Sequence, residues 1–97
     1  MYLYNVSIIV EETQHDELIK WVKNEWIPSL QQADVKFLKM IDSPHEGHTY
    51  CIQLVFDEKE LVKEFQEKHL LTLQYQIGNK HAEKAFIFDS TMQYLSL

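Results

Sequence analysis

The densest group of side chains that could do chemistry lies in one short segment, Asp42 to His48. His45 and His48 are three residues apart, and such a pair in a loop could bind one divalent ion with help from Asp42 or Glu46. A closed zinc site needs four ligands, however, and the spacing fixes no further one. We therefore predict a polar turn here and no metal site.

The other nucleophilic and basic side chains lack the neighbours that catalysis needs. Cys51 is the only cysteine, and no base lies close to it in sequence to activate the thiol. His69 falls on an apolar helix stripe, as a core histidine does, while His15 and His81 fall near element ends and are expected in solvent. The sequence has no glycine-rich phosphate loop, no Gly-x-Ser-x-Gly turn and no carboxylate pair at a catalytic spacing. We predict no catalytic residue and no cofactor, and whether the protein is an enzyme stays open.

Composition excludes several classes of partner. The 97 residues carry a formal net charge of −6, and all nine cationic side chains are lysines. Nucleic-acid binding relies on a basic surface with arginine for bidentate contacts, and anionic membranes repel an acidic chain, so neither partner is predicted. One cysteine cannot form an internal disulfide, and Met1 is not followed by a signal peptide. We expect one cytoplasmic domain covering residues 1–97.

Four segments show the composition of β-strands, and the clearest of them alternate with period two. In the first, every even position is apolar or aromatic, which indicates one fully buried face. In the third, the even positions also share a face. The predicted strands are residues 2–10, 35–41, 48–56 and 84–94.

Two helices are predicted between these strands. The first begins at Thr13 as N-cap and ends near Pro28. The second begins at Asp57 as N-cap and runs to about residue 76, with Gly78 in the terminating position. The order is then β-α-β-β-α-β. With right-handed crossovers it gives an α+β, ferredoxin-like fold: a four-stranded antiparallel sheet of order 4-1-3-2 with both helices on one face.

The face that the helices leave open is the surface that indicates function. It is expected to be half apolar, and an exposed patch of that kind usually marks an interface, so we predict a homodimer in which two sheets pack together. The apolar interface candidates on this face are Leu3, Ile9, Val55 and Ile87, and those on the helices are Trp21, Leu71 and Tyr75. The polar candidates for ligand binding are Asn5, Ser7, Cys51, Gln53, Asp89 and Thr91. These polar groups either line a ligand pocket between subunits or hydrogen-bond across the interface and set its register.

Four segments along the chain carry a resemblance: Tyr4–Ser7, Trp21 with Ile27-Pro28, Thr49–Gln53 and Phe86–Phe88. In this order they resemble an uncharacterised bacterial family, catalogued as domain of unknown function 4286. The resemblance implies membership of the dimeric α/β-barrel group of ferredoxin-like folds, in which two sheets form one barrel. It implies no activity. The chain departs from the family at Asp89-Ser90, where relatives place a basic residue and a threonine, so a role for that basic position does not carry over.

Three functions follow as hypotheses. The first is a small homodimeric module that binds a small molecule or a protein partner, and the absence of a catalytic constellation favours it. The second is an enzyme similar to the cofactor-independent monooxygenases of the dimeric α/β-barrel group, with Asn5, Gln53 and His48 as polar groups in the cavity between the sheets. The third is a structural or regulatory dimer without a pocket. Fold alone does not choose among them.

Overall fold

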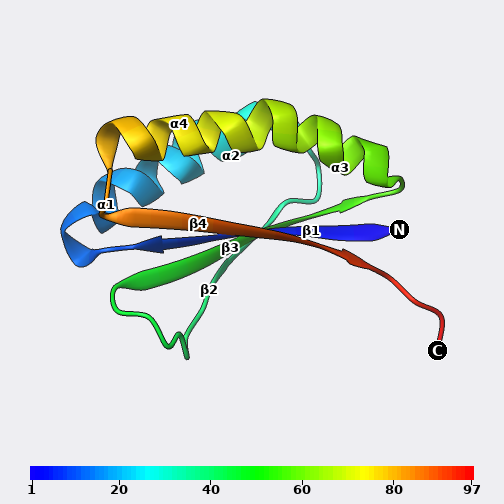
Figure 1. Ribbon diagram of the computed structural model, residues 1–97, viewed down its shortest axis with the longest axis horizontal. Helices are drawn as coiled ribbons and strands as arrows, with labels where there is room; N and C mark the ends of the chain where they lie inside the picture. The colour runs from blue at the N-terminus through cyan, green and yellow to red at the C-terminus, as the bar shows by residue number, and fades with distance from the viewer.

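A computed structural model describes all 97 residues and confirms the predicted order of elements (Figure 1). The strands are β1 (Tyr2–Val10), β2 (Lys36–Lys39), β3 (His48–Phe56) and β4 (Ala85–Gln93). The first helical segment comprises α1 (Glu12–Trp21), the π-helical turn η1 (Val22–Trp26) and α2 (Ile27–Ser29). The second comprises α3 (Lys59–Phe65), the π-helical turn η2 (Gln66–Leu70) and α4 (Leu71–Lys80).

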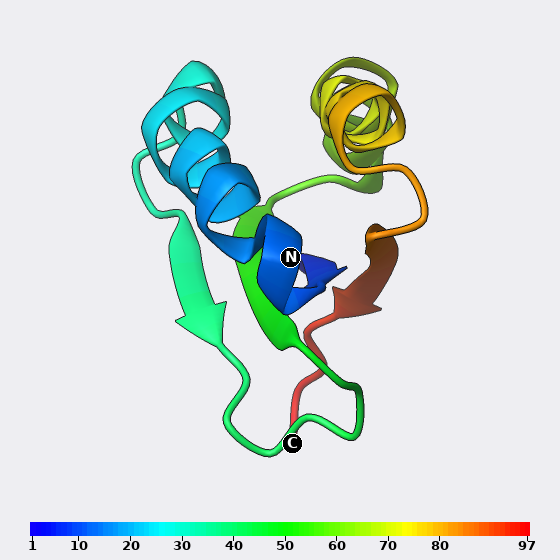
Figure 2. The same cartoon turned by 90° about the vertical axis from the view of Figure 1, so that its left-hand side faces the viewer.

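The sheet is antiparallel throughout, with the order β2-β3-β1-β4, which is the predicted 4-1-3-2 read from the other edge. Both helical segments lie on one face, and the opposite face carries no layer of its own (Figure 2). None of the helices is long and apolar enough to cross a membrane.

The core lies between the sheet and the helices. The even side chains of β1 from Tyr4 to Val10 are fully buried, as their alternation predicts. Seventeen apolar residues form one buried cluster, to which the first helical segment contributes Leu18 and Trp26 and the second contributes Phe65 and Leu73. A single core on one side of the sheet leaves the odd residues of β1 to face the other way.

Three predicted helix boundaries are wrong. Asp57 is not the N-cap of the second helix, because α3 begins at Lys59 and the capping position, Glu58, makes no side-chain bond. Thr13 is not the N-cap, because α1 begins at Glu12 and the capping position, Glu11, makes no side-chain bond. Gly78 does not end the second helix, which continues to Lys80. A side chain at Gly78 would meet no atom within 4 Å, so this glycine sits in an ordinary helical turn.

The predicted facing of β4 is also wrong. Ile87, Asp89 and Thr91 lie opposite the even residues of β1, so they point toward the helices and not to the open face. The turn before β4 sets this register: Glu83 has a φ of 66°, and the amides of Lys84 and Ala85 both donate to the His81 carbonyl. A register shifted by one residue exchanges the two faces of a strand, so the open face receives the even residues of β4.

Candidate functional site

The open sheet face is more apolar than the sequence predicts. Leu3, Ile9 and Val55 lie on it as expected. The corrected facing of β4 adds Phe86 and Phe88, which are 54% and 60% exposed. Other exposed apolar side chains on this face are Leu38 and Met92. A contiguous apolar surface of this kind marks a binding surface or an interface.

Charge is almost missing from this face. In the register of the four strands, the only charged side chain that points to this side is Lys36, on the short edge strand β2. The remainder of the net charge of −6 therefore lies on the helices, the loops and the opposite face of the sheet. Two copies with the same charge can approach through this face without placing acidic groups against one another.

A hydrogen-bonded polar cluster crosses the two central strands of the open face. Gln53 Nε2 donates to Asn5 Oδ1 at 3.2 Å, and Asn5 Nδ2 donates to Ser7 Oγ at 3.0 Å. Ser7 Oγ lies 3.6 Å from Cys51 Sγ. The pairing of β1 with β3 places Asn5 opposite Gln53 and Ser7 opposite Cys51, so the strand register builds the cluster. The structure thus brings together four of the six predicted polar residues.

This cluster is suited to hold an uncharged group. The Gln53 carbonyl oxygen takes part in none of these bonds, so it can accept a hydrogen bond from a bound molecule. Carboxamides and hydroxyls bind polar groups in an apolar wall but neither donate nor remove a proton readily. The geometry therefore favours binding over acid–base chemistry.

Asp89 has a structural role on the helix side of the sheet. It accepts hydrogen bonds from the Tyr4 hydroxyl at 2.7 Å and from Gln66 Nε2 at 3.0 Å. Burial is the main cause that raises the pKa of Tyr4, and the hydrogen bond to Asp89 adds to it. Thr91 points to the same side. The face assigned to these two predicted ligand-binding residues is therefore wrong.

The predicted helix candidates lie elsewhere. Trp21 is partly buried and packs against the core, whereas Leu71 and Tyr75 are exposed on α4. They belong to the helical segments, and the sheet lies between these segments and the open face (Figure 2). They form no common surface with the sheet residues.

The prediction that His15 and His81 lie in solvent is wrong, because His15 is partly buried and His81 is 1% exposed. His15 and His48 form a cluster that the sequence does not predict. The rings of His15 and His48 lie 3.9 Å apart, and His48 is hydrogen-bonded to Glu12. His15 bonds Asp16 at 2.8 Å and Tyr50 at 2.7 Å. Burial, followed by the nearby acids Asp16 and Glu12, raises the pKa of Tyr50. The cluster joins α1 to β3. Its members from the two elements are more than thirty residues apart in sequence, so local spacing does not reveal that they meet.

His45 stays in the exposed turn, apart from this cluster. No three side chains of histidine, cysteine, aspartate or glutamate are arranged to hold a metal ion. His48 points to the helix side, so the open face receives no imidazole from β3.

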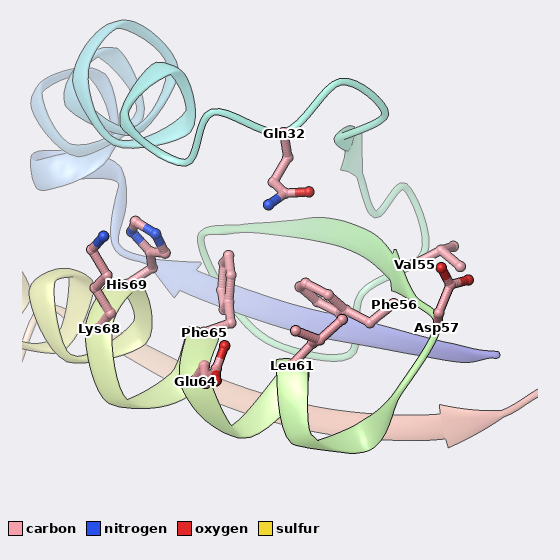
Figure 3. A pocket seen from close by; sticks show the side chains of 9 residues that line it. All are labelled: Gln32, Val55, Phe56, Asp57, Leu61, Glu64, Phe65, Lys68 and His69. Atoms are coloured by element: carbon pink, nitrogen blue, oxygen red, sulfur yellow. The ribbon is translucent and has the colours of Figure 1, made fainter.

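A groove of about 400 Å³ lies at the end of β3, between α3 and the loop after α2 (Figure 3). Its apolar floor is formed by Phe56, Leu61 and Phe65, and Gln32 borders it from the loop. His69 stands at one end, and burial, followed by the charge of Lys68, lowers its pKa. The sequence does not predict this groove. Gln32 lies in a connecting loop, and its approach to β3 and α3 depends on the folded chain.

The sequence model of a family described as a domain of unknown function, DUF4286, matches residues 1–95. The chain belongs to this family. The membership confirms the resemblance seen in the four strand and helix segments. No curated protein matches this DUF4286 chain in sequence.

Solved structures share the fold over nearly the whole DUF4286 chain. An antibiotic biosynthesis monooxygenase has a TM-score of 0.64 at 10% identity, with 99% of this chain and 100% of that chain covered. A mutant of MhuD, which holds two manganese protoporphyrin IX molecules per active site, has a TM-score of 0.60 at 11% identity, with 100% and 98% covered. The designed protein Foldit4 has a TM-score of 0.63 at 14% identity, with 97% and 98% covered. An enzyme and a designed protein on one fold show that the fold does not fix the function.

Proposed function

We propose that this DUF4286 protein is a homodimeric binding module. In this proposal two copies pack their open sheet faces together and hold a small, uncharged, mainly apolar molecule between them. The observation that carries the proposal is the polar cluster of Asn5, Ser7, Cys51 and Gln53 within an exposed apolar face that is almost free of charge.

The size of the face suits such a dimer. Strands of nine residues in a four-stranded sheet cover about 30 Å by roughly 17 Å, or about 500 Å² on each copy. Pairing two faces therefore buries about 1,000 Å², the lower limit for a specific interface. Two sheets pack about 10 Å apart, and between them the small side chains of Ser7 and Cys51 leave more room than the phenylalanines beside them.

The cytoplasm is the proposed compartment. Cys51 is free and partly buried on the open face, and a reducing compartment keeps a lone thiol from forming disulfides between chains.

Sedimentation velocity and calorimetry test this proposal. We expect a dimer at micromolar concentration and saturable binding of 1-naphthol, a neutral aromatic probe with one hydroxyl group. Gln53→Leu should weaken this binding about tenfold, which corresponds to the loss of one hydrogen bond of about 1.4 kcal/mol. Gln74→Leu removes the same amide from an exposed helix position and should leave binding unchanged.

Two results would contradict the proposal. A chain that stays monomeric at 100 µM would rule out both the dimer and the binding site between its subunits. A dimer that binds none of 1-naphthol, indole and decanol would rule out ligand binding. The polar cluster would then only set the register of the interface.

The alternative is an enzyme similar to the cofactor-independent monooxygenases. It is supported by the Asn5–Gln53 pair at the centre of a fold that a monooxygenase shares. It is weakened by His48, the third polar group expected for it, which is bonded to Glu12 on the other side of the sheet. Oxygen consumption with a neutral hydroquinone, lost in Asn5→Leu, would favour the enzyme over the binding module.

A further inference from the structure

A second hollow lies on the helix side of the sheet, between α3, the start of β1 and the end of β4 (Figure 1). Its volume of about 490 Å³ is within the range of small-molecule sites. The sheet lies between this hollow and the open face, so it is separate from the proposed dimer site. The residues that line it are Tyr2 from β1, Lys59, Val62, Lys63 and Gln66 from the second helical segment, and Thr91 and Gln93 from β4.

The charge of this hollow is opposite to that of the whole chain. Both charged residues in the lining are lysines, although the chain has 15 acidic residues and only nine lysines. Lys59 and Lys63 are four residues apart in α3, so they lie on one side of the helix, where like charges repel. Neither forms an ion pair with a carboxylate, not even with Glu60 or Glu67 on neighbouring turns. Two positive charges without a partner in the protein therefore border the hollow.

Uncharged hydrogen-bonding groups face the lysines from the sheet. The register of β4 turns Thr91 and Gln93 toward the helix side, where both side chains are exposed and can donate hydrogen bonds. The only acid on this face of β4 is Asp89, which lies outside the lining. It already accepts hydrogen bonds from the Tyr4 hydroxyl and from Gln66 Nε2. The lining itself thus offers donors and positive charge.

The remainder of the lining is apolar. Val62 belongs to the buried core, and Tyr2 is partly buried and packs against that core. They place an aliphatic and an aromatic surface beside the two ammonium groups. A molecule that matches this hollow has an anionic head and an apolar or aromatic body.

Charge and the number of acceptors identify the head group. A phosphate monoester carries a charge of about −1.5 to −2 at pH 7 and has three strong acceptor oxygens. A carboxylate has a single charge and two oxygens. Two lysines with further donors opposite them therefore match a phosphate monoester better than a carboxylate.

We propose that this hollow binds a small organic phosphate monoester. The phosphoryl oxygens contact the ammonium groups of Lys59 and Lys63, and the Thr91 hydroxyl donates to them from the opposite wall. The organic group lies against Tyr2 and Val62. The lining holds no histidine, cysteine or carboxylate, so the site binds the ester and has no group to hydrolyse it.

Calorimetric titration with phenyl phosphate at low ionic strength tests the proposal. We expect one site per chain, with a dissociation constant in the submillimolar range. Replacing both lining lysines, in Lys59→Gln with Lys63→Gln, should weaken binding about tenfold or more, because hydrogen bonds to charged groups are the strong ones. Lys20→Gln with Lys23→Gln removes the same charge from exposed positions of the first helical segment. This control should change the dissociation constant by less than about twofold, since distant charges are screened.

Further probes distinguish a built site from general attraction to lysines. Thr91→Val removes a hydroxyl without changing the charge and should weaken phenyl phosphate about fivefold, the loss of one hydrogen bond. Thr72→Val, at an exposed position of α4, should leave binding unchanged. Phenyl sulfate has one charge and inorganic phosphate has no ring, so each should bind more weakly than phenyl phosphate. Vesicles that contain phosphatidate carry the same monoester on a membrane and should not bind this acidic chain.

Four results would overturn the proposal. They are no binding of phenyl phosphate, an equal loss of binding in the two double-lysine variants, equal affinity for phenyl phosphate and inorganic phosphate, and binding to phosphatidate vesicles without binding to phenyl phosphate. The outcome is independent of the proposed function. A chain that stays monomeric and binds phenyl phosphate would support this inference while it contradicts the dimer.

Discussion

Phe88→Asp is the most direct test of the open face as an interface. Phe88 is 60% exposed in the single chain, and full burial of a phenylalanine side chain stabilises by about 1.5–3 kcal/mol. Covering the exposed part contributes about 1–2 kcal/mol, and twofold symmetry counts it twice, so about 2–4 kcal/mol of dimer stability is lost. Each unpaired carboxylate at the interface adds a desolvation penalty of several kcal/mol. The dissociation constant should rise at least 1,000-fold, equivalent to about 4 kcal/mol.

Sedimentation velocity over a concentration series measures this change. Tyr75→Asp is the control, because Tyr75 is 73% exposed on α4, away from the sheet. Both variants should keep the wild-type circular dichroism, since exposed substitutions rarely change folding stability by more than about 0.5 kcal/mol. If Phe88→Asp sediments as a dimer with an unchanged dissociation constant, the open face is not the interface and the reasoning fails.

Ile87→Asp provides a contrast one residue away. Ile87 packs against the core beneath the helices, so a carboxylate there should lower the midpoint of thermal unfolding instead of dissociating a folded dimer. An Ile87→Asp chain that melts like the wild type would contradict the register described for β4.

The remaining predictions concern the stability of the fold. Gly47→Ala should lower the free energy of unfolding by about 2 kcal/mol or more, because Gly47 has a φ of 83° and an added Cβ would lie 2.3 Å from the Val10 carbonyl oxygen. Gly78→Ala is the matched control and should raise this free energy by up to about 1 kcal/mol in urea denaturation, since it adds a helix-favouring residue in open space. The raised pKa of Tyr4 gives stability that is complete below the unfolded value of 10.0 and declines as the pH rises above it, because the unfolded chain then loses the proton first. Urea midpoints between pH 9 and 11 should therefore fall in the wild type and fall less in Tyr4→Phe, and equal slopes would contradict the buried Tyr4–Asp89 bond.

The sequence predicts the layers of this fold because β1 alternates without exception on its even side. Tyr4, Val6 and Ile8 can only be buried together by a layer on one face, and two helices are the only elements available to form it. The same reasoning fails on β4, where Phe86, Ile87 and Phe88 are consecutive and both faces are apolar. There the turn at Glu83 decides the register, and a left-handed conformation at a glutamate has no signature in sequence.

Only the part of the candidate site that lies on the two central strands, β1 and β3, could be predicted from the sequence. Asn5 and Gln53 meet because β1 and β3 are adjacent, and that adjacency follows from the order of the elements. The groove and the His15–His48 pair depend on side chains from segments that approach only after folding. Local spacing carries no information about such contacts, so hydrophobic periodicity could not have revealed them.

The two π-helical turns have a consequence for how this chain tolerates changes in length. In each, an amide bonds the carbonyl five residues earlier, Ile27 to Val22 in one helix and Leu71 to Gln66 in the other, so each turn holds one residue more than an α-turn. Deleting one exposed residue there, such as Lys23 or Glu67, would convert the bulge into ordinary α-helix and leave the residues on either side in phase with the core. The same deletion one turn away would rotate the rest of the helix by about 100° and bring its buried stripe into water.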